Sequence, residues 1–308
     1  MVPTRVNGWV WPMPERWLLT GGTGQVGLAL RRSAPAGVEI IAPRRTQLDL
    51  TDPQDVGSWL HGVSAVINCA AYTAVDQAEC EPEQAMQVNA TAPGILARAA
   101  AQTGIPLVHV STDYVFPADG TGPWREHDRA KPGNAYGESK FAGEQAVRAS
   151  GARHAIVRTA WVVSADGTNF VKTMLRLGAE REVLRVVADQ RGTPTHAGDL
   201  ASALVTIAQR FTGNPDQPSG TWHCTNAGET NWNGLATRIF ARAEELGLKV
   251  PEVVEPIRTA DYPTRAIRPQ DSRLDCSLAA RDFGIALRPW EEAVSDIVGE
   301  LASEGLAA

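Results

Sequence analysis

The stretch LLTGGTGQVG, residues 18–27, decides the fold class. Its glycines at 21, 24 and 27 come directly after a short apolar run and open a helical pattern that begins at Gln25. A glycine-rich turn between a strand and a helix lets backbone N–H groups and the helix dipole hold a pyrophosphate. The spacing alone is weak, because a chain with 28 glycines contains it by chance about one time in five. Its place before a helix gives it weight, although a tight turn without a ligand is the alternative.

Outward from this turn, short apolar runs alternate with helical segments. The pattern predicts strands at 17–19, 38–42, 65–68, 107–111 and 156–159, with helices at 25–33, 53–61, 81–102 and 136–149. Continuous apolar runs are typical of parallel strands that are buried on both faces. The sequence therefore predicts an α/β fold, a Rossmann-type doubly wound parallel sheet followed by a smaller mixed α/β substrate region.

The alternation loosens after about residue 165. Helices are expected there at 169–180, 197–210 and 232–246, and strands at 184–187, 221–224 and 253–256. We predict an N-terminal arm over 1–15, a dinucleotide-binding domain over 16–165, and a mainly substrate-binding region over 166–308, some of whose segments return to the sheet.

Composition excludes several other classes of protein. The 308 residues include 35 acidic and 29 basic side chains, which argues against nucleic acid as a partner. No apolar run has the length of a membrane span, so no membrane partner is expected. The cysteines at 69, 80, 224 and 276 show no CxxC spacing, and the six histidines no paired spacing. We therefore expect no metal site and a reducing, cytoplasmic location.

The end of the second predicted strand bears on the choice of dinucleotide. An acidic residue there holds the ribose hydroxyls of NAD, whereas this chain places Arg44 and Arg45 at that point. Two guanidinium groups suit a 2′-phosphate, so the sequence predicts NADPH, with NADH possible. Asp49 and Leu50 are candidates to flank the adenine. The alternative is that the two arginines are solvated surface residues.

Tyr136 and Lys140 form a YxxxK pair. The spacing of four residues puts both side chains on one helix face. A nearby ammonium lowers the pKa of a phenol, so Tyr136 is predicted to be a general acid with Lys140 beside it. Thr112, at the end of the strand before this helix, is placed to donate a hydrogen bond to a carbonyl oxygen.

Together these motifs resemble the extended short-chain dehydrogenases/reductases, and within them the family of the dTDP-4-dehydrorhamnose reductases. The resemblance covers residues 16 to 300 and is most specific in STDYVFP, 111–117, followed by YGESK, 136–140. It implies catalysis by Thr112, Tyr136 and Lys140. It further implies a cofactor site that includes Gly21, Thr23, Gly24, Gln25, Val26, Ala70, Ala71, Tyr72 and Asn89, and a substrate site that includes Thr73, Val75, Thr112, Trp161 and Asn169.

The same resemblance implies NADPH-dependent reduction of the C4 ketone of dTDP-4-dehydro-L-rhamnose, with a homodimer as one possible assembly. The alternatives are reduction of another dTDP-deoxysugar and a non-catalytic NADP-binding regulatory subunit. Dehydratases of this fold have an Asp-Glu pair after the threonine, whereas here Asp113 is followed by Tyr114. Arg268 and Arg273 are candidates for the substrate diphosphate or, equally, surface charges.

Overall fold

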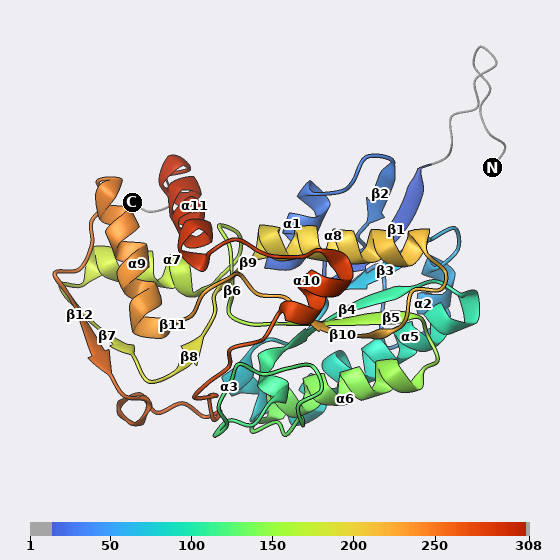
Figure 1. Cartoon of the computed structure of the whole chain (residues 1–308), viewed down its shortest axis with the longest axis horizontal. Helices are drawn as coiled ribbons and strands as arrows, with labels where there is room; N and C mark the ends of the chain where they lie inside the picture. Colours follow the sequence, from blue (N-terminus) through green and yellow to red (C-terminus); the bar gives the residue numbers. More distant parts are fainter. Residues whose placement is uncertain (1–13, 306–308) are drawn as a thin grey trace, which may run out of the picture.

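The computed structural model describes residues 14–305. It has two lobes, one built around a central sheet and one built from helices beside a short strand pair (Figure 1). The predicted N-terminal arm lies outside the described residues except for its last two positions. Glu15 already belongs to the first strand, β1 (Glu15–Thr20), so the predicted boundary between arm and strand is corrected.

The central sheet has six parallel strands in the order β10-β5-β4-β3-β1-β2. The chain turns outward in opposite directions from β1 and β3, and the crevice at such a point takes the ligand in folds of this kind. The Rossmann-type prediction is confirmed. Besides β1, the sheet contains β2 (Val38–Ile41), β3 (Ala65–Asn68), β4 (Leu107–Thr112), β5 (His154–Thr159) and β10 (Gly220–His223).

Helices cover both faces of the sheet because residues along each strand point alternately to either side. Trp17 and Leu19 pack in one apolar cluster with α1 (Gln25–Arg32), α8 (Ala197–Gly213) and α10 (Ser277–Phe283), and Leu18 packs in another on the opposite face. That second cluster is covered by α2 (Pro53–Trp59), α5 (Ala92–Thr103) and α6 (Ala135–Ala149).

The second lobe has an apolar core of its own, formed by α7 (Phe170–Glu180), α9 (Trp232–Glu245) and α11 (Trp290–Ser303). These helices lie beside the parallel pair β7 (Val183–Val187) and β12 (Val253–Ile257). Two short pairs complete the lobe: β6 (Val162–Val163) with β9 (Thr195–His196), and β8 (Arg191–Gly192) with β11 (Thr230–Asn231).

Two features of the chain depart from the predicted elements. The expected helix over 81–102 is divided into α4 (Pro82–Met86), a π-helical turn η1 (Gln87–Thr91) and α5. The sequence analysis also did not predict α3 (Val75–Ala78), the 3₁₀ turns η2 (Asp113–Val115) and η3 (Thr259–Asp261), the last two helices, or the two-residue strands. Most of these elements are short, where periodicity carries little signal, whereas the 14 residues of α11 have apolar positions at helical spacing that the sequence analysis missed.

Candidate active site

The glycine loop after β1 is shaped for close backbone approach. Gly21 has a φ of +75°, and a Cβ there would lie 2.5 Å from the Ala70 nitrogen. A Cβ at Gly27 would lie 2.2 Å from the Gly21 carbonyl oxygen. Gly24 precedes α1 and no side chain caps the helix, so the first N–H groups of Gln25 and Val26 are available to a phosphate. Thr23 is exposed in the same loop. The loop therefore fits the pyrophosphate of a dinucleotide.

Gln25 connects this loop to the second lobe. Its side-chain oxygen accepts hydrogen bonds from Asn169 Nδ2 at 3.0 Å and from Ser164 Oγ at 2.9 Å. Asn169 also caps α7 by accepting from the Lys172 N–H at 3.3 Å. Two residues assigned to different subsites, Gln25 and Asn169, thus meet where the lobes join.

Arg44 and Arg45 are exposed after β2, and neither forms a salt bridge within residues 14–305. Their guanidinium groups are therefore available to a 2′-phosphate. The Asp49 carboxylate instead stabilises the turn in which it lies. It accepts hydrogen bonds from the Thr51 N–H and from the Thr51 hydroxyl, and these bonds lower the pKa of Asp49. Leu50 is half-buried against the core on this side of the sheet.

The loop after β3 is held by two buried asparagines. Asn68 Oδ1 accepts from the Thr20 hydroxyl at 2.6 Å and from the Ala70 N–H at 3.1 Å. Asn89, in the π-helical turn, accepts from the Tyr72 N–H at 2.8 Å and donates to the Tyr72 carbonyl at 3.0 Å. The backbone at Ala70, Ala71 and Tyr72 is thereby fixed beside the glycine loop.

Asn89 also ties this loop to α6. Its Nδ2 donates to Ser139 Oγ at 2.9 Å, and Ser139 donates in turn to the Tyr136 carbonyl at 2.8 Å. The helix approaches so closely that a Cβ at Gly143 would lie 2.0 Å from the Asn89 carbonyl oxygen. The π-helical turn thus places the Asn89 side chain between the loop after β3 and α6, and π-helical turns are frequent at functional positions.

The structure brings Tyr136 and Lys140 to one buried face of α6. Asn134 caps this helix by accepting from the Gly137 N–H at 2.8 Å. Lys140 Nζ donates to the Val110 carbonyl at 2.7 Å, and burial lowers the pKa of the ammonium to about 8. These contacts hold the amine at the carboxyl edge of the sheet.

The expectation that Lys140 lowers the pKa of Tyr136 is corrected. Burial raises the pKa of the phenol well above its ordinary value, and the nearby Thr112 hydroxyl opposes this only in part. Lys140 is not among the groups that shift this pKa, and its ammonium donates to the Val110 carbonyl. Tyr136 is therefore firmly protonated in the chain by itself.

Thr112 is the last residue of β4 and is buried. Its hydroxyl donates to Asp113 Oδ1 at 2.8 Å and accepts from the Tyr114 N–H at 3.2 Å. Tyr114 packs edge-on against Tyr136, with ring centroids 5.4 Å apart. The sequence analysis assigned no site role to Asp113 or Tyr114, although both stand in the stretch that carried the family resemblance.

The predicted sugar-site residues lie on separate segments. Thr73 is exposed before α3, and Val75 is the first residue of that helix. Trp161 follows β5 with a φ of +46° and stacks on Trp232 of the second lobe, with ring centroids 3.6 Å apart. A Cβ at Gly192 would lie 2.5 Å from the Trp161 ring, so this glycine makes room for the indole.

Arg268 and Arg273 are both paired with carboxylates. Arg268 lies 2.5 Å from Asp76 Oδ2 and donates to the Tyr114 hydroxyl at 3.0 Å. Arg273 lies 2.6 Å from Asp271 and also contacts Glu229. Neither guanidinium is free for a substrate diphosphate in this arrangement, and Arg268 instead ties the C-terminal loop to α3 and η2.

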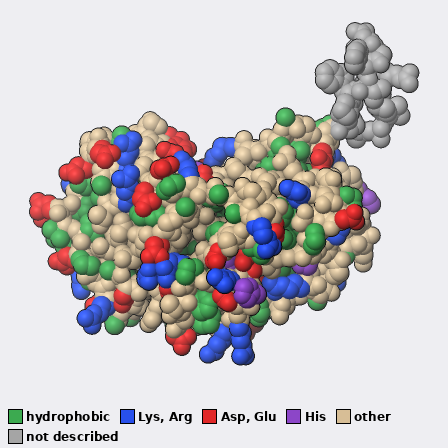
Figure 2. Space-filling model, viewed as in Figure 1, with side chains coloured by type: hydrophobic (Ala, Val, Ile, Leu, Met, Phe, Trp, Pro, Cys, Tyr) green, Lys and Arg blue, Asp and Glu red, His purple; other side chains and the backbone are tan. Residues whose placement is uncertain are grey.

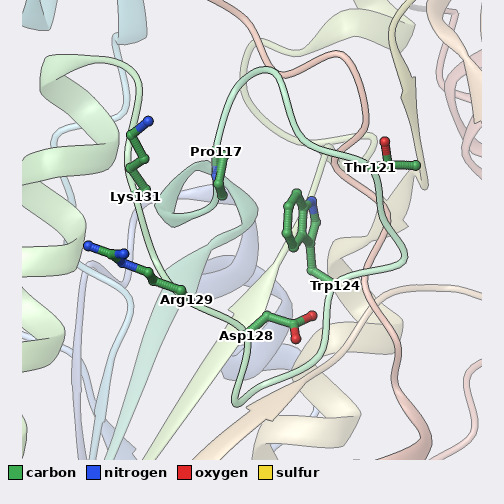
Figure 3. A pocket seen from close by; sticks show the side chains of 6 residues that line it. All are labelled: Pro117, Thr121, Trp124, Asp128, Arg129 and Lys131. Carbon is green, nitrogen blue, oxygen red and sulfur yellow. The ribbon is translucent and has the colours of Figure 1, made fainter.

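A separate hollow of about 600 Å³ lies in the loop between η2 and α6. Figure 3 shows Trp124 beside Pro117 there, with Arg129 and Lys131 pointing away from the indole. Its lining includes none of the predicted site residues. Acidic and basic side chains are interspersed on the face of the molecule shown in Figure 2.

Two kinds of feature were not found in the part of the chain that the structure describes. No group of three or more metal-ligating side chains lies close enough together to hold an ion. None of the helices between residues 14 and 305 combines the length and the apolar character that crossing a membrane requires.

Comparison with known proteins decides the family. The family model described as the RmlD substrate binding domain matches residues 15–303. The chain belongs to the dTDP-4-dehydrorhamnose reductase family. It is 42% identical to the dTDP-4-dehydrorhamnose reductase of Sinorhizobium fredii over 94% of this chain and 99% of that relative. It is 40% identical to the Salmonella typhimurium enzyme of the same name over 92% and 97%.

Solved structures agree with this membership. The dTDP-4-dehydrorhamnose reductase of Bacillus anthracis, solved in complex with NADP, has a TM-score of 0.85 and 36% identity and covers 94% of this chain and 100% of its own. As a member of the dTDP-4-dehydrorhamnose reductase family, the chain is an NAD(P)-dependent oxidoreductase.

Proposed function

We propose that this protein uses NADPH to reduce the C4 ketone of dTDP-4-dehydro-L-rhamnose to dTDP-L-rhamnose. The observation that carries the proposal is that the Thr112 hydroxyl at the end of β4 lies near the Tyr136 phenol, on the buried face of α6 that also bears Lys140, in a chain of this family. A ketone reduction needs a hydride source, a proton donor and a hydrogen bond to the carbonyl oxygen. At this edge of the sheet, the glycine loop would hold the hydride donor, Tyr136 would donate the proton, and Thr112 would donate the hydrogen bond.

The loop residues fit a nicotinamide dinucleotide. The proposed contacts to its phosphates are the N–H groups of Gln25 and Val26, which the missing side-chain cap leaves free, while the Gly24 N–H donates to the Gly21 carbonyl and shapes the loop. Arg44 and Arg45 are proposed to hold the 2′-phosphate because no carboxylate within the described residues pairs with them. When bound, NADPH supplies the hydride.

The remaining steps belong to side chains of this chain. Tyr136 donates its phenolic proton to the C4 oxygen as negative charge develops there, and its raised pKa keeps the proton in place beforehand. Lys140 is proposed to turn from the Val110 carbonyl when the cofactor is bound, to stabilise the phenolate and to hold the nicotinamide ribose. Thr112 donates a hydrogen bond to the same C4 oxygen. Thr73, Val75 and Trp161 are proposed to line the sugar, with Asn169 on the nucleotide side.

The test is NADPH oxidation with dTDP-4-dehydro-L-rhamnose, with the product identified by chromatography. Tyr136→Phe removes the proton donor and is expected to lower kcat at least about 100-fold. Tyr262→Phe is the matched control, because Tyr262 is exposed and makes no hydrogen bond through its hydroxyl within residues 14–305. NADPH binding without turnover would contradict the proposed substrate and favour another 4-keto sugar or a regulatory subunit.

We also propose a cytoplasmic location, where the nucleotide sugar and NADPH are made, and a homodimer. All four cysteines are free, as a reducing compartment requires. Sedimentation velocity tests the assembly: a species of twice the mass of 33.0 kDa supports the dimer, and a monomer at every concentration contradicts it.

A further inference from the structure

Asp113 is a buried carboxyl at the centre of the site without an assigned task. It begins the 3₁₀ turn η2 directly after Thr112, and only 2% of its surface is exposed. Its Oδ1 is 2.8 Å from the Thr112 hydroxyl oxygen, and its Oδ2 is buried and makes no hydrogen bond of ordinary geometry within residues 14–305, although the Ser272 hydroxyl is near enough to lower the pKa of the carboxyl. A buried carboxylate oxygen without a donor is costly, which points to a carboxyl that gains something by taking up a proton.

The direction of the bond between Thr112 and Asp113 decides what Thr112 can do. A hydroxyl has one hydrogen, and an ionised carboxylate can only accept. With Asp113 ionised, the Thr112 hydrogen therefore points to Asp113. The oxygen already accepts from the Tyr114 N–H, so no donor is left for a ketone, which itself can only accept.

A proton on Asp113 reverses this arrangement. The neutral carboxyl donates to Thr112 Oγ1, and the Thr112 hydrogen is then free to point at a carbonyl oxygen in the cleft. Two hydrogen bonds that run in the same direction polarise each other, so the second becomes a better donor. The proton stays on Asp113 through the reaction, while C4 receives its hydride from the cofactor and its oxygen a proton from Tyr136.

The surroundings of Asp113 shift the change between its ionised and neutral forms toward neutral pH, so that about half of the carboxyls carry a proton at pH 6. Burial raises its pKa to about 6, against the lowering effects of the Thr112 and Ser272 hydroxyls. The titratable groups that face it are Tyr114 in its own turn and Tyr136 on α6. Arg268, from the C-terminal loop, bonds to the Tyr114 hydroxyl and to Asp76, so its charge is already paired.

We propose that Asp113 is a positioning residue whose proton turns the Thr112 hydroxyl toward the substrate carbonyl. This rests on the proposed function, in which Thr112 donates to the C4 oxygen. It requires no group beyond those described, because solvent supplies the proton before the substrate binds.

The main test compares kcat at pH 6 and at pH 8 in wild type and in Asp113→Asn. We expect wild-type kcat to be about tenfold higher at pH 6, because loss of one donor to the developing oxyanion costs up to about 100-fold. In Asp113→Asn the amide N–H donates to Thr112 at both pH values, so the ratio is expected to fall to about two, which is the part that partial deprotonation of Lys140 near pH 8 contributes in both proteins. Asp119→Asn, at an exposed position in the following loop, keeps the wild-type ratio. An unchanged ratio in Asp113→Asn overturns the proposal.

A second measurement does not depend on turnover or on the folding of Asp113→Asn. The Asp113 carboxyl is followed by carbon NMR during a pH titration of wild type and of Thr112→Val, with NADPH bound. We expect a midpoint near pH 6 in wild type and a higher one in Thr112→Val, which lacks the hydroxyl that favours ionisation. A midpoint at the ordinary value for aspartate overturns the proposal. If wild type does not reduce the sugar but this titration is as expected, the proposed substrate fails and the proton placement stands.

Discussion

At the scale of single residues, Arg44 and Arg45 carry the choice of dinucleotide. Both are exposed at the end of β2 and unpaired within the described part of the chain, and a charge-assisted bond to a phosphate contributes about 1.5 to 3 kcal/mol. Replacing both by alanine is expected to raise the KM for NADPH about 10- to 100-fold and to leave the KM for NADH within about threefold. Initial rates with each cofactor measure this, and an equal rise for both would contradict it.

The glycine loop, the arginines and the YxxxK pair could be predicted because each is a local pattern with its own chemistry. Asp113 and Asn89 could not be assigned in the same way. Asp113 matters through its burial and through a hydroxyl beside it, neither of which one sequence displays. Asn89 works across 17 residues to the Tyr72 backbone and across 50 to Ser139. Such tertiary contacts leave no periodic trace.

At the scale of elements, the contact between α6 and the π-helical turn η1 sets the position of Tyr136 and Lys140. A Cβ at Gly143 would lie 2.0 Å from the Asn89 carbonyl oxygen, so Gly143→Ala must push the two elements apart. We expect a loss of about 1 to 3 kcal/mol in the free energy of unfolding and at least about a tenfold loss in kcat.

Gly299→Ala on α11 is the matched control. A Cβ at this helical glycine meets no atom within 4 Å, so the substitution is expected to stabilise by about 0.4 to 1 kcal/mol and to leave kcat unchanged. Urea unfolding and steady-state rates measure both variants. If Gly143→Ala behaved like Gly299→Ala, close packing of α6 on η1 would not be needed.

A buried ion pair joins the same helix to β5. Glu144 is 0% exposed and lies 2.7 Å from Arg158. Glu144→Gln leaves the buried Arg158 guanidinium without its opposite charge, so the free energy of unfolding is expected to fall by about 3 to 5 kcal/mol at pH 7. Burial tends to raise the pKa of Glu144, but Arg158 and Ser111 dominate and lower it to about 2.

A carboxyl with a lowered pKa in the folded state adds stability above its unfolded pKa, and that stability is lost as the pH falls through its folded pKa. The difference in unfolding free energy between wild type and Glu144→Gln should therefore narrow from pH 4.5 toward pH 2. Glu180→Gln breaks only an exposed pair with Arg176 and should change the stability by less than about 0.5 kcal/mol throughout. A constant difference for Glu144→Gln would show that its charge is not what stabilises the fold.

At the scale of the whole molecule, the two halves of the chain share the central sheet. β10 pairs with β5, and α8 contributes Leu200 and Leu204 to the cluster that contains Trp17. We therefore expect one cooperative thermal transition with equal calorimetric and van't Hoff enthalpies. A chain cut after residue 165 should show no cooperative transition, since it lacks both elements. Two resolved transitions in the full chain would contradict shared folding.

NADPH should raise the transition temperature of the full chain, because a ligand at about 100 times its Kd adds about 2.7 kcal/mol to the free energy of unfolding. The parallel pairing of the first five strands could be predicted from the alternation of strands and helices, but their order could not. The sequence analysis expected some segments of the second region to return to the sheet. It predicted a short strand around Thr221 and Trp222, but nothing in the sequence indicated that this strand, β10, would pair with β5. A strand that is distant in the sequence pairs with whichever edge strand of the sheet still has unpaired backbone groups, and this depends on the tertiary structure.

The stacked indoles of Trp161 and Trp232 give this molecule a built-in optical signal. Two such chromophores at 3.6 Å couple their strong electronic transitions, so far-ultraviolet circular dichroism should contain a paired band of opposite signs. One ring follows the last strand of the N-terminal half and the other begins α9 of the second lobe. Because both rings pack against the core of the second lobe, the amplitude of that band measures in unlabelled protein whether the chain after β5 stays docked on this lobe as ligands enter and leave.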